Sequence, residues 1–353
     1  MNNILIINPF GIGDVLFTTP VIRNLRLAYP QARIAFLANR RTSEFLHYHP
    51  DIHKVFVYER DEFVAIYGRN PLAFAQKWAH LLGEIRLQKF DAVFDFSLNS
   101  TFGFLSMSCG IPRRIGFDYR GRGRFLTDKF PLAGYEGKHV IEHYLDLLSH
   151  VGVPIVEKHM TIHIQPQNVQ WVKDWFKAQD VDTRKPLVAM VPGGGQSWGV
   201  AAKFKRWPAA QYAALADKII EKYDCAIILL GDKNEEPLSR EVARLAGSPL
   251  YSAVGETSIL QMAALMQECR LSIVNDGGPL HIAVACGAKT LSIFGPVDPV
   301  VYGPYPAGGH KVVQKGLPCQ PCYRRFRMAQ CEHVNCLNHL SVDEVYRKVE
   351  HLL

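Results

Sequence analysis

The chain of 353 residues lacks several features that define large classes of proteins. No apolar run approaches the roughly 18–20 residues that a membrane-spanning helix needs. Residues 1–14 carry no basic stretch and reach Asp14 early, which is unlike a secretory signal. No repeat of solenoid period and no low-complexity tract interrupts the sequence. We therefore expect a globular protein that stays in the cytoplasm.

The chain does have ample apolar content and an excess of positive charge. Its hydrophobic fraction of 48% and charged fraction of 21% predict a substantial core, and its length suits two domains. The net charge of +7 suits an anionic partner, such as a nucleotide sugar, a phosphorylated glycolipid or an anionic membrane face. Nucleic acid is the competing partner. Because no nucleic-acid motif accompanies the charge, we predict no nucleic-acid binding.

Residues 271–304 are the most informative stretch of the sequence. Apolar runs of strand length at 271–274 and 290–294 flank a sequence, Asn-Asp-Gly-Gly-Pro, that predicts a tight turn into a helix. The bare amides and the dipole at such a helix start attract a diphosphate. Asp276 in the turn can accept hydrogen bonds from ribose hydroxyls. His281 lies in the first turn, where the dipole disfavours its protonation but still allows one N–H to reach a phosphate oxygen.

An ordinary α/β crossover with a satisfied histidine would give the same helix pattern. A second rigid loop, Gly-Pro-Val-Asp-Pro at 295–299, follows the next strand. Both loops lie at the carboxyl edge of the expected sheet, where open α/β sheets bind their ligands. The pair of loops therefore favours a ligand site.

The run from Asn275 to Pro299 resembles the signature of the family 9 glycosyltransferases, the ADP-heptose:lipopolysaccharide heptosyltransferases. Their pattern is roughly D-[TS]-G-x-x-H-x-A-A-A, followed by a strand that ends F-G-P-T-D-P. This chain has Gly277 where a hydroxyl residue is common and Val297 where threonine is common. The resemblance extends along nearly the whole chain. It implies an α/β fold of GT-B architecture, with two facing Rossmann-like domains of parallel sheet, a site in their cleft, and inverting heptosyl transfer from ADP-heptose without a catalytic cofactor.

The N-terminal part reads as a Rossmann-like start, with a strand at 4–7, a glycine loop at 8–14 and a helix over 15–29. An NAD enzyme would place Asp or Glu at the end of the second strand, where this chain has Asn39 followed by two arginines. The arginines suit NADP, so an NADP-dependent oxidoreductase is the alternative function. In the resembled family, the position of Asp14 is that of the base that takes the acceptor proton, and Gly13 lies beside it in the acceptor site.

Five arginines between residues 113 and 124, interleaved with glycines, predict a mobile basic loop. A solvated loop is the plain interpretation of such a run. The arginine fork is suited to phosphates and carboxylates. We therefore predict that Arg120, Arg122 and Arg124 clamp an anionic acceptor.

The second half of the chain carries the expected donor contacts. Gly193 and Gly194 follow a predicted strand at 187–191, and glycines there let the backbone approach a ligand closely. By resemblance, the K-x-W-P motif places Lys205 on the donor diphosphate as a catalytic and binding residue. The resemblance also implies a nucleoside contact from a glutamate in loop 231–237, for which Glu235 and Glu236 are candidates and Glu235 is our assignment. It places the remaining donor contacts at Asp276, Gly277, Gly278 and His281.

Four of the eight cysteines lie close together as C-x2-C-x8-C-x4-C, which is typical of a tetrathiolate metal site. They are Cys319, Cys322, Cys331 and Cys336. Disulfides are disfavoured in the cytosol, and sulfur ligands suit zinc and iron alike. Related protein heptosyltransferases use a four-cysteine finger to hold iron. We predict a structural zinc or iron ion, with four unligated thiols that pack a loop as the alternative. We interpret the D-x-D motif at 180–182 as chance, because it lies in a polar connection.

The predicted organisation is an acceptor-binding domain over 1–165 and a nucleotide-sugar-binding domain over 166–340 with a Cys-rich segment at 319–336. A final helix over 341–353 is expected to pack back toward the first domain. The predicted partners are an ADP-sugar donor, an anionic glycolipid acceptor and, peripherally, the inner face of the cytoplasmic membrane. Inner-core heptose is the first candidate acceptor and Kdo the second. Another envelope glycan, a protein acceptor and a non-catalytic nucleotide-sugar sensor stay open.

Overall fold

The computed structural model describes residues 1–194 and 196–353, so Gly195 of the predicted glycine loop lies outside the described residues. The chain divides into two compact units. The first comprises residues 1–135 and 140–159, and the second comprises residues 136–139 and 160–353. Within the described part, no helix combines the length and the apolar character that a bilayer crossing requires.

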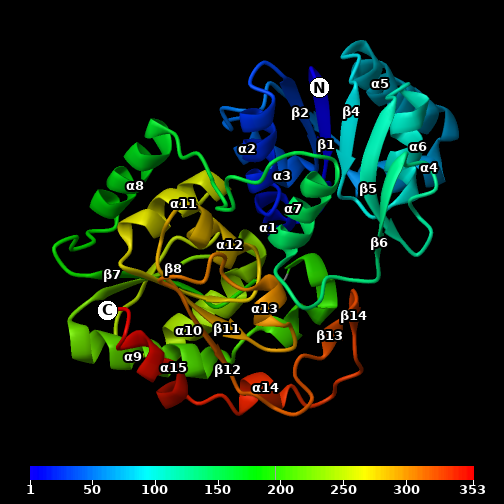
Figure 1. Cartoon of the computed structure of the whole chain (residues 1–353). Helices are drawn as coiled ribbons and strands as arrows, with labels where there is room; N and C mark the ends of the chain where they lie inside the picture. Colours follow the sequence, from blue (N-terminus) through cyan, green and yellow to red (C-terminus); the bar gives the residue numbers. More distant parts are fainter. Residues whose placement is uncertain (195) are drawn as a thin grey trace. The chain divides into compact units, whose positions relative to one another are not determined.

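The first unit is built on a six-stranded parallel sheet in the order β3-β2-β1-β4-β5-β6 (Figure 1). Its strands are β1 (Asn3–Ile7), β2 (Arg33–Ala38), β3 (Lys54–Val57), β4 (Ala92–Asp95), β5 (Arg113–Tyr119) and β6 (Asp128–Leu132). Its helices are α1 (Ile12–Leu16), α2 (Thr19–Ala28), α3 (Arg40–Leu46), α4 (Arg60–Arg69), α5 (Pro71–Leu87), α6 (Ser100–Ser108) and α7 (Val140–His150). Strand order reverses at β1, so the loops after β1 and β4 open side by side at the carboxyl edge.

The second unit repeats this plan with the strand order β12-β11-β10-β7-β8-β9, again all parallel. Its strands are β7 (Leu187–Val191), β8 (Ala226–Leu229), β9 (Tyr251–Ser252), β10 (Leu271–Asn275), β11 (Thr290–Phe294) and β12 (Lys311–Gln314). A separate antiparallel hairpin joins β13 (Tyr323–Arg324) to β14 (Arg327–Met328). The helices are α8 (Pro166–Ala178), α9 (Ala209–Tyr223), α10 (Glu236–Leu245), α11 (Ile259–Glu268), α12 (Gly278–Ala285), α13 (Pro299–Tyr302), α14 (Asn335–Asn338) and α15 (Val342–Val349), with 3₁₀ segments η1 (Gln196–Lys205) and η2 (Lys233–Glu235).

The central strands are buried on both faces, which explains their continuous apolar sequences. Every residue of β7, β10 and β11 is buried, as are the last four of β1. Parallel sheets covered by helices on both sides require such strands. Two Rossmann-like parallel sheets confirm the predicted α/β class.

The helix expected over 15–29 is two helices in the structure. It breaks between α1 and α2, because Pro20 has no amide to donate and two threonines bond to the backbone there. The hydroxyl of Thr18 donates to the carbonyl of Val15 at 2.5 Å, and that of Thr19 donates to the carbonyl of Leu16 at 2.7 Å. Local side-chain bonds of this kind compete with helix continuation.

The expected basic loop at 113–124 is also partly regular. Residues 113–119 form strand β5, so only the turn that begins at Arg120 connects it to β6. Arg113 pairs with Asp128 at 3.3 Å, and Arg114 donates to the carbonyls of Ile111 and Phe125. These two arginines therefore hold the strand ends.

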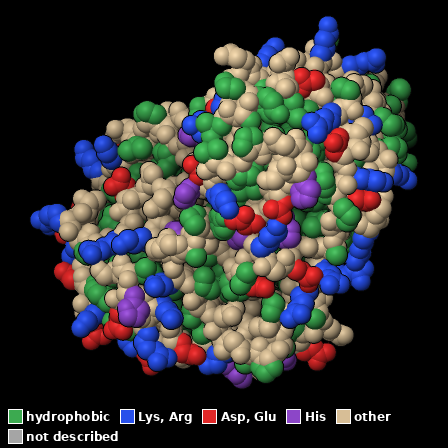
Figure 2. All heavy atoms as spheres, in the orientation of Figure 1, with side chains coloured by type: hydrophobic (Ala, Val, Ile, Leu, Met, Phe, Trp, Pro, Cys, Tyr) green, Lys and Arg blue, Asp and Glu red, His purple; other side chains and the backbone are tan. Residues whose placement is uncertain are grey.

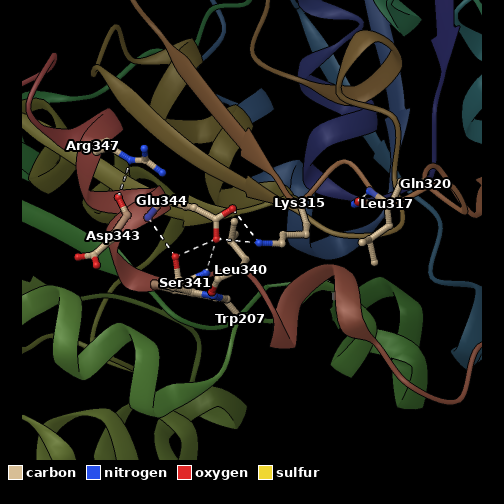
Figure 3. Close-up of polar contacts among 9 residues, drawn as sticks. All are labelled: Trp207, Lys315, Leu317, Gln320, Leu340, Ser341, Asp343, Glu344 and Arg347. Atoms are coloured by element: carbon tan, nitrogen blue, oxygen red, sulfur yellow. Dashed lines mark hydrogen bonds and ion pairs between the residues drawn. The ribbon is translucent and has the colours of Figure 1, made fainter.

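The C-terminal helix α15 is part of the second unit, and the expectation that it packs back toward the first domain stays a prediction. Its apolar side, with Val345 and Val349, is fully buried in the core of the second unit beside α9 and β12. Figure 3 shows how its first turn is fastened: Lys315 pairs with Glu344 at 2.9 Å, and the indole of Trp207 donates to the carbonyl of Leu340 at 2.9 Å.

Candidate active site

The loop after β1 holds Asp14 in the first turn of α1. The side-chain amide of Asn8 donates to the carbonyl of Asp14 at 2.9 Å, and that of Asn39 donates to the carbonyls of Pro9 and Phe10 at 3.3 and 2.5 Å. Two asparagines at strand ends thus pin the loop from both sides. The Asp14 carboxylate is half-buried and lies near Gly11, where an added Cβ would be 3.5 Å from its oxygen.

The hydrogen bonds of Asn39 and the ion pair of Arg40 argue against the NADP alternative. Asn39 stands where an NAD enzyme would have its ribose-binding carboxylate, and it instead bonds the loop and caps α3 by accepting from the amide of Thr42 at 2.9 Å. Arg40 pairs with Glu62 at 2.5 Å. These residues already have structural partners within their own unit.

The buried phenol of Tyr135 lies close enough to Asp14 for the carboxylate to affect its pKa. Burial, Tyr144 and the Asp14 carboxylate together hold the pKa of Tyr135 well above its usual range. Tyr135 therefore stays a neutral phenol throughout the physiological pH range. The predicted acceptor contact of Gly13, which is helical and half-buried next to Asp14, stays a prediction.

The three arginines predicted to clamp the acceptor are exposed in the turn between β5 and β6. The guanidinium groups of Arg120 and Arg122 lie 4.9 and 5.5 Å from the ring centre of Tyr119, and that of Arg124 lies 4.8 Å from the ring centre of Phe125. Each guanidinium lies over an aromatic ring, and such a contact leaves its positive charge in place for an anion. Their role in acceptor binding stays a prediction.

In the second unit, the glycine loop after β7 is fastened by a buried carboxylate. Glu235, which is 5% exposed, accepts from the amide of Gly194 at 2.5 Å and from the amide of Asp232 at 3.1 Å. Arg206 completes the cluster, since it lies 3.4 Å from the same carboxylate and donates to the carbonyl of Gly194 at 3.2 Å. Glu235 thus sets the path of the loop.

Two glycines are required by this arrangement. A Cβ at Gly193 would lie 2.2–2.6 Å from the Glu235 carboxylate, closer than any real contact. Gly194 has a φ of +102°, which side chains rarely adopt. The structure also separates the two candidate glutamates, because Glu236 pairs with Arg240 on α10 while Glu235 faces the glycine loop.

Lys205 and Asp276 form a buried ion pair at the carboxyl edge of the sheet. Their Nζ and Oδ2 atoms are 2.6 Å apart, and the side chains are only 9% and 4% exposed. The ammonium also lies 4.1 Å from the ring centre of Trp198. The sequence placed both residues in the donor site but did not predict that they pair with each other.

Asn275, which the sequence predicts only as a turn residue, connects its own turn to the glycine loop and to the segment at Trp207. Its amide donates to the carbonyls of Pro192 and Gly193 at 2.8 and 2.9 Å, and its oxygen accepts from the amide of Trp207 at 3.3 Å. A polar residue that ends a wholly buried strand was the signal available in the sequence. Arg206, between Lys205 and Trp207, was also missed.

Gly277 caps α12 and Gly278 is its first residue, so the predicted helix begins two residues after Asp276. His281 is 4% exposed in the first turn of α12. Burial first, and then the nearby charges of His139 and Lys205, hold its pKa well below the usual value. The imidazole is therefore neutral, as expected, although burial rather than the helix dipole is the main cause. A neutral ring can donate one N–H to an anion.

The four cysteines of the segment 319–336 gather on the second unit. Burial and the thiols of Cys319 and Cys331 raise the pKa of Cys322, and burial together with the other three thiols raises the pKa of Cys336 to about 11. The four sulfurs thus lie within electrostatic reach of one another. Across the described ranges 1–194 and 196–353, however, no set of three or more His, Cys, Asp or Glu side chains has the spacing of a metal site.

Taken together, the second unit presents backbone amides, a helix start, a buried ammonium and a neutral imidazole at one sheet edge. Such a set suits a diphosphate, whose negative charge these groups stabilise without a proton transfer. The first unit presents a half-buried carboxylate that can accept a proton.

Comparisons with known proteins show the family of the chain. The model of glycosyltransferase family 9 (heptosyltransferase) matches residues 78–333. Lipopolysaccharide heptosyltransferase 3 of Escherichia coli is 26% identical over 302 residues, which cover 83% of each chain. Lipopolysaccharide heptosyltransferase 2 of E. coli K12 is 24% identical over 309 residues, which cover 84% of this chain and 83% of that protein.

Solved structures show the same fold. A family 9 glycosyl transferase from Veillonella parvula matches with a TM-score of 0.84 at 21% identity, covering 99% of this chain and 97% of that one. E. coli ADP-heptose heptosyltransferase II matches with a TM-score of 0.77 at 20% identity, covering 100% and 98%. These likenesses confirm the predicted GT-B fold.

The contact between Gly193 and Glu235 gives a first test. In Gly193→Ala, the added methyl group forces the Glu235 carboxylate off the Gly194 amide and leaves buried polar groups unpaired, which costs roughly 1–3 kcal/mol. We expect ADP affinity, measured by isothermal titration calorimetry, to fall roughly tenfold or more. The control is Gly308→Ala, where a Cβ meets nothing within 4 Å. Unchanged ADP affinity in a folded Gly193→Ala variant would contradict this role of the loop.

Proposed function

Because the chain belongs to glycosyltransferase family 9, the heptosyltransferases, we propose that it transfers heptose from ADP-heptose to a heptose or Kdo residue of the lipopolysaccharide inner core. The observation that carries the donor half is the buried Lys205–Asp276 pair beside the start of α12 and the glycine loop. The relatives named above as lipopolysaccharide heptosyltransferases support the acceptor half.

In this proposal the two units divide the chemistry. Asp14 takes the proton from an acceptor hydroxyl as that oxygen attacks the anomeric carbon, and ADP leaves with the electrons of the broken bond. Lys205, the α12 amides and the neutral His281 stabilise the negative charge that grows on the diphosphate. Asp276, once Lys205 turns to the phosphates, becomes an acceptor for hydroxyl groups of the donor. The NADP alternative gains no support, because Asn39 and Arg40 are engaged within the fold.

We also propose that the first unit contacts an anionic membrane surface, where a glycolipid acceptor would reside. The outward side of α4 and α5 exposes Val64, Tyr67, Leu72 and Leu87, each 62–78% accessible. Hydrophobic and basic side chains lie side by side in Figure 2 at the upper right, where Figure 1 places these helices. The exposed basic residues of this surface are Arg60, Arg69, Arg86 and Lys89.

The acidic residues there are mostly neutralised. Glu62 pairs with Arg40 and Lys77, and Glu84 pairs with Lys54. An apolar surface with a basic rim suits the boundary of an anionic bilayer, since burial and charge attraction act together.

The four cysteines are proposed to hold a structural zinc or iron ion. Their residue types and sequence spacing fit a tetrathiolate site, and the neighbouring thiols help to raise the pKa of Cys322 and of Cys336. Thiolates would replace the protonated thiols on binding, because a metal ion lowers the pKa of its sulfur ligands. The role of the ion would be to fix the segment 319–336.

The central test uses purified protein with ADP-heptose and a soluble inner-core acceptor, with products identified by mass spectrometry. Asp14→Asn should lower kcat by roughly 10²–10⁴, because the base is lost, while ADP affinity stays within twofold of wild type. Asp61→Asn, an exposed carboxylate on α4, should leave both unchanged. A wild-type kcat in Asp14→Asn would remove the base assignment, and a product without added heptose would refute the donor.

Membrane contact is tested by sedimentation with vesicles that contain phosphatidylglycerol. The double variant Leu72→Glu/Leu87→Glu should lose most vesicle binding, because it puts two anions on the proposed surface, while turnover of the soluble acceptor stays normal. Val156→Glu is the matched control, since Val156 is 72% exposed elsewhere on the first unit. Equal vesicle binding by the double variant would place the membrane contact elsewhere or exclude it.

Elemental analysis of protein purified without a tag tests the metal proposal. We expect about one zinc or iron ion per chain, and we expect Cys322→Ser to lower the melting temperature more than it lowers kcat measured well below melting. Substoichiometric metal in every preparation, together with four freely titrating thiols, would show that the segment is held by packing alone.

A further inference from the structure

We propose that Trp198 and Tyr323 are positioning residues that hold the Lys205 ammonium in place for the donor diphosphate. The inference rests on the proposed role of Lys205 and extends it to two residues in neither the glycine loop nor α12. Because Tyr323 belongs to the cysteine-rich segment, the inference also connects this segment to the donor site.

The first step is the contact between Lys205 and Trp198. The Nζ atom lies 4.1 Å from the ring centre of Trp198 and 2.6 Å from the Asp276 carboxylate. A lysine ammonium is a point charge on a flexible four-carbon stem, so its position depends on what surrounds it. The face of an indole attracts a cation, more strongly where water is largely excluded. Trp198 therefore restrains Lys205 without neutralising its charge.

Trp198 itself lies in an irregular part of the chain. It belongs to η1, which is interrupted at Gly199 by a non-helical backbone with φ 57° and ψ −127°. The ring is only half-buried and does not belong to the core of the second unit. Its position is fixed by Tyr323, whose ring centre is 4.8 Å away at a tilt of 41°.

Tyr323 is in turn well anchored. It begins β13, its amide donates to the carbonyl of Pro296 at 2.9 Å, and its ring lies 6.1 Å from that of Tyr302 on α13. The preceding residues are fastened to the same loop, because the Gln320 amide donates to the carbonyl of Gly295 at 2.6 Å. Tyr323 thus lies inside the Cys-rich segment and is held against the Gly-Pro-Val-Asp-Pro loop.

The loop closes back on the neighbour of Lys205. A Cβ at Gly295 would lie 2.9 Å from the carbonyl oxygen of Phe204 and 3.1 Å from Leu337, so the backbone packs tightly there. Gln320 also accepts from the amide of Leu317 at 2.8 Å, a contact that Figure 3 shows to the right of Lys315. The Cys-rich segment is therefore linked to Lys205 through direct contacts, from Tyr323 to Trp198 and from Trp198 to the Lys205 ammonium.

A purely structural role for the two rings predicts a different result from a positioning role. If the rings only stabilise the fold, their removal changes ADP affinity by the same factor whether or not Lys205 is present. If they act through Lys205, their effect disappears once the ammonium is gone. A double-mutant cycle separates the two cases.

The experiment measures the Kd of ADP by calorimetry for Trp198→Ala and Tyr323→Ala, each in the wild-type and the Lys205→Ala background. Each single change should weaken ADP roughly five- to tenfold, and should change it less than twofold when Lys205 is already alanine. Trp198→Phe and Tyr323→Phe should restore most of the affinity, because a ring remains. Trp171→Ala, which removes a half-buried indole stacked on Trp175 in α8, should have no effect.

Three results would overturn the inference. The first is an unchanged Kd in both single variants, and the second is an equal loss in the Lys205→Ala background. In either case Lys205→Ala still weakens ADP, so the proposed function survives. The third is Lys205→Ala with wild-type ADP affinity, which removes the proposed role of Lys205 and the inference with it. If an alanine variant does not fold, the same cycle is run with Trp198→Leu and Tyr323→Leu, which remove the rings but keep more apolar volume.

Discussion

The buried ion pair between Lys205 and Asp276 is the interaction on which the rest of the donor site depends. The two side chains are 9% and 4% exposed, so neither charge has much water around it. An unpaired charge in such a place costs several kcal/mol, and the pair therefore needs both partners and further polar contacts. The ring of Trp198 contacts the ammonium, and burial lowers the pKa of His281 so that its ring adds no positive charge. An anion that enters meets a cation that is already desolvated and positioned.

The glycine loop and the ion pair serve the site in different ways. Glu235 and Asn275 fix the backbone with hydrogen bonds that a ligand need not break. The Lys205–Asp276 pair is exchangeable instead, because a diphosphate can replace Asp276 as the partner of the ammonium. A backbone held by hydrogen bonds therefore lies beside a charge pair whose carboxylate a phosphate can replace.

Much of this could be predicted from the sequence, because short apolar runs followed by glycine turns mark buried parallel strands and their loops. The sequence placed Gly193, Lys205, Asp276 and His281 at one sheet edge, and the structure brings Lys205 and Asp276 into contact. Glu235 rather than Glu236 turns inward because it closes a capping box with Asp232, and the sequence interpretation did not use that spacing. The helix break at Thr18–Thr19 was hidden because the apolar pattern continues through it, although the two hydroxyls bond to the backbone there. The packing of α15 depends on core residues that are distant in the sequence.

A crystal structure of the chain with ADP bound tests the central claim most directly. The account predicts a phosphate oxygen within hydrogen-bond distance of the Lys205 Nζ atom, the Asp276 carboxylate released from it, and the glycine loop unmoved around Glu235. ADP bound elsewhere, with the 2.6 Å contact between Lys205 and Asp276 intact, would contradict it.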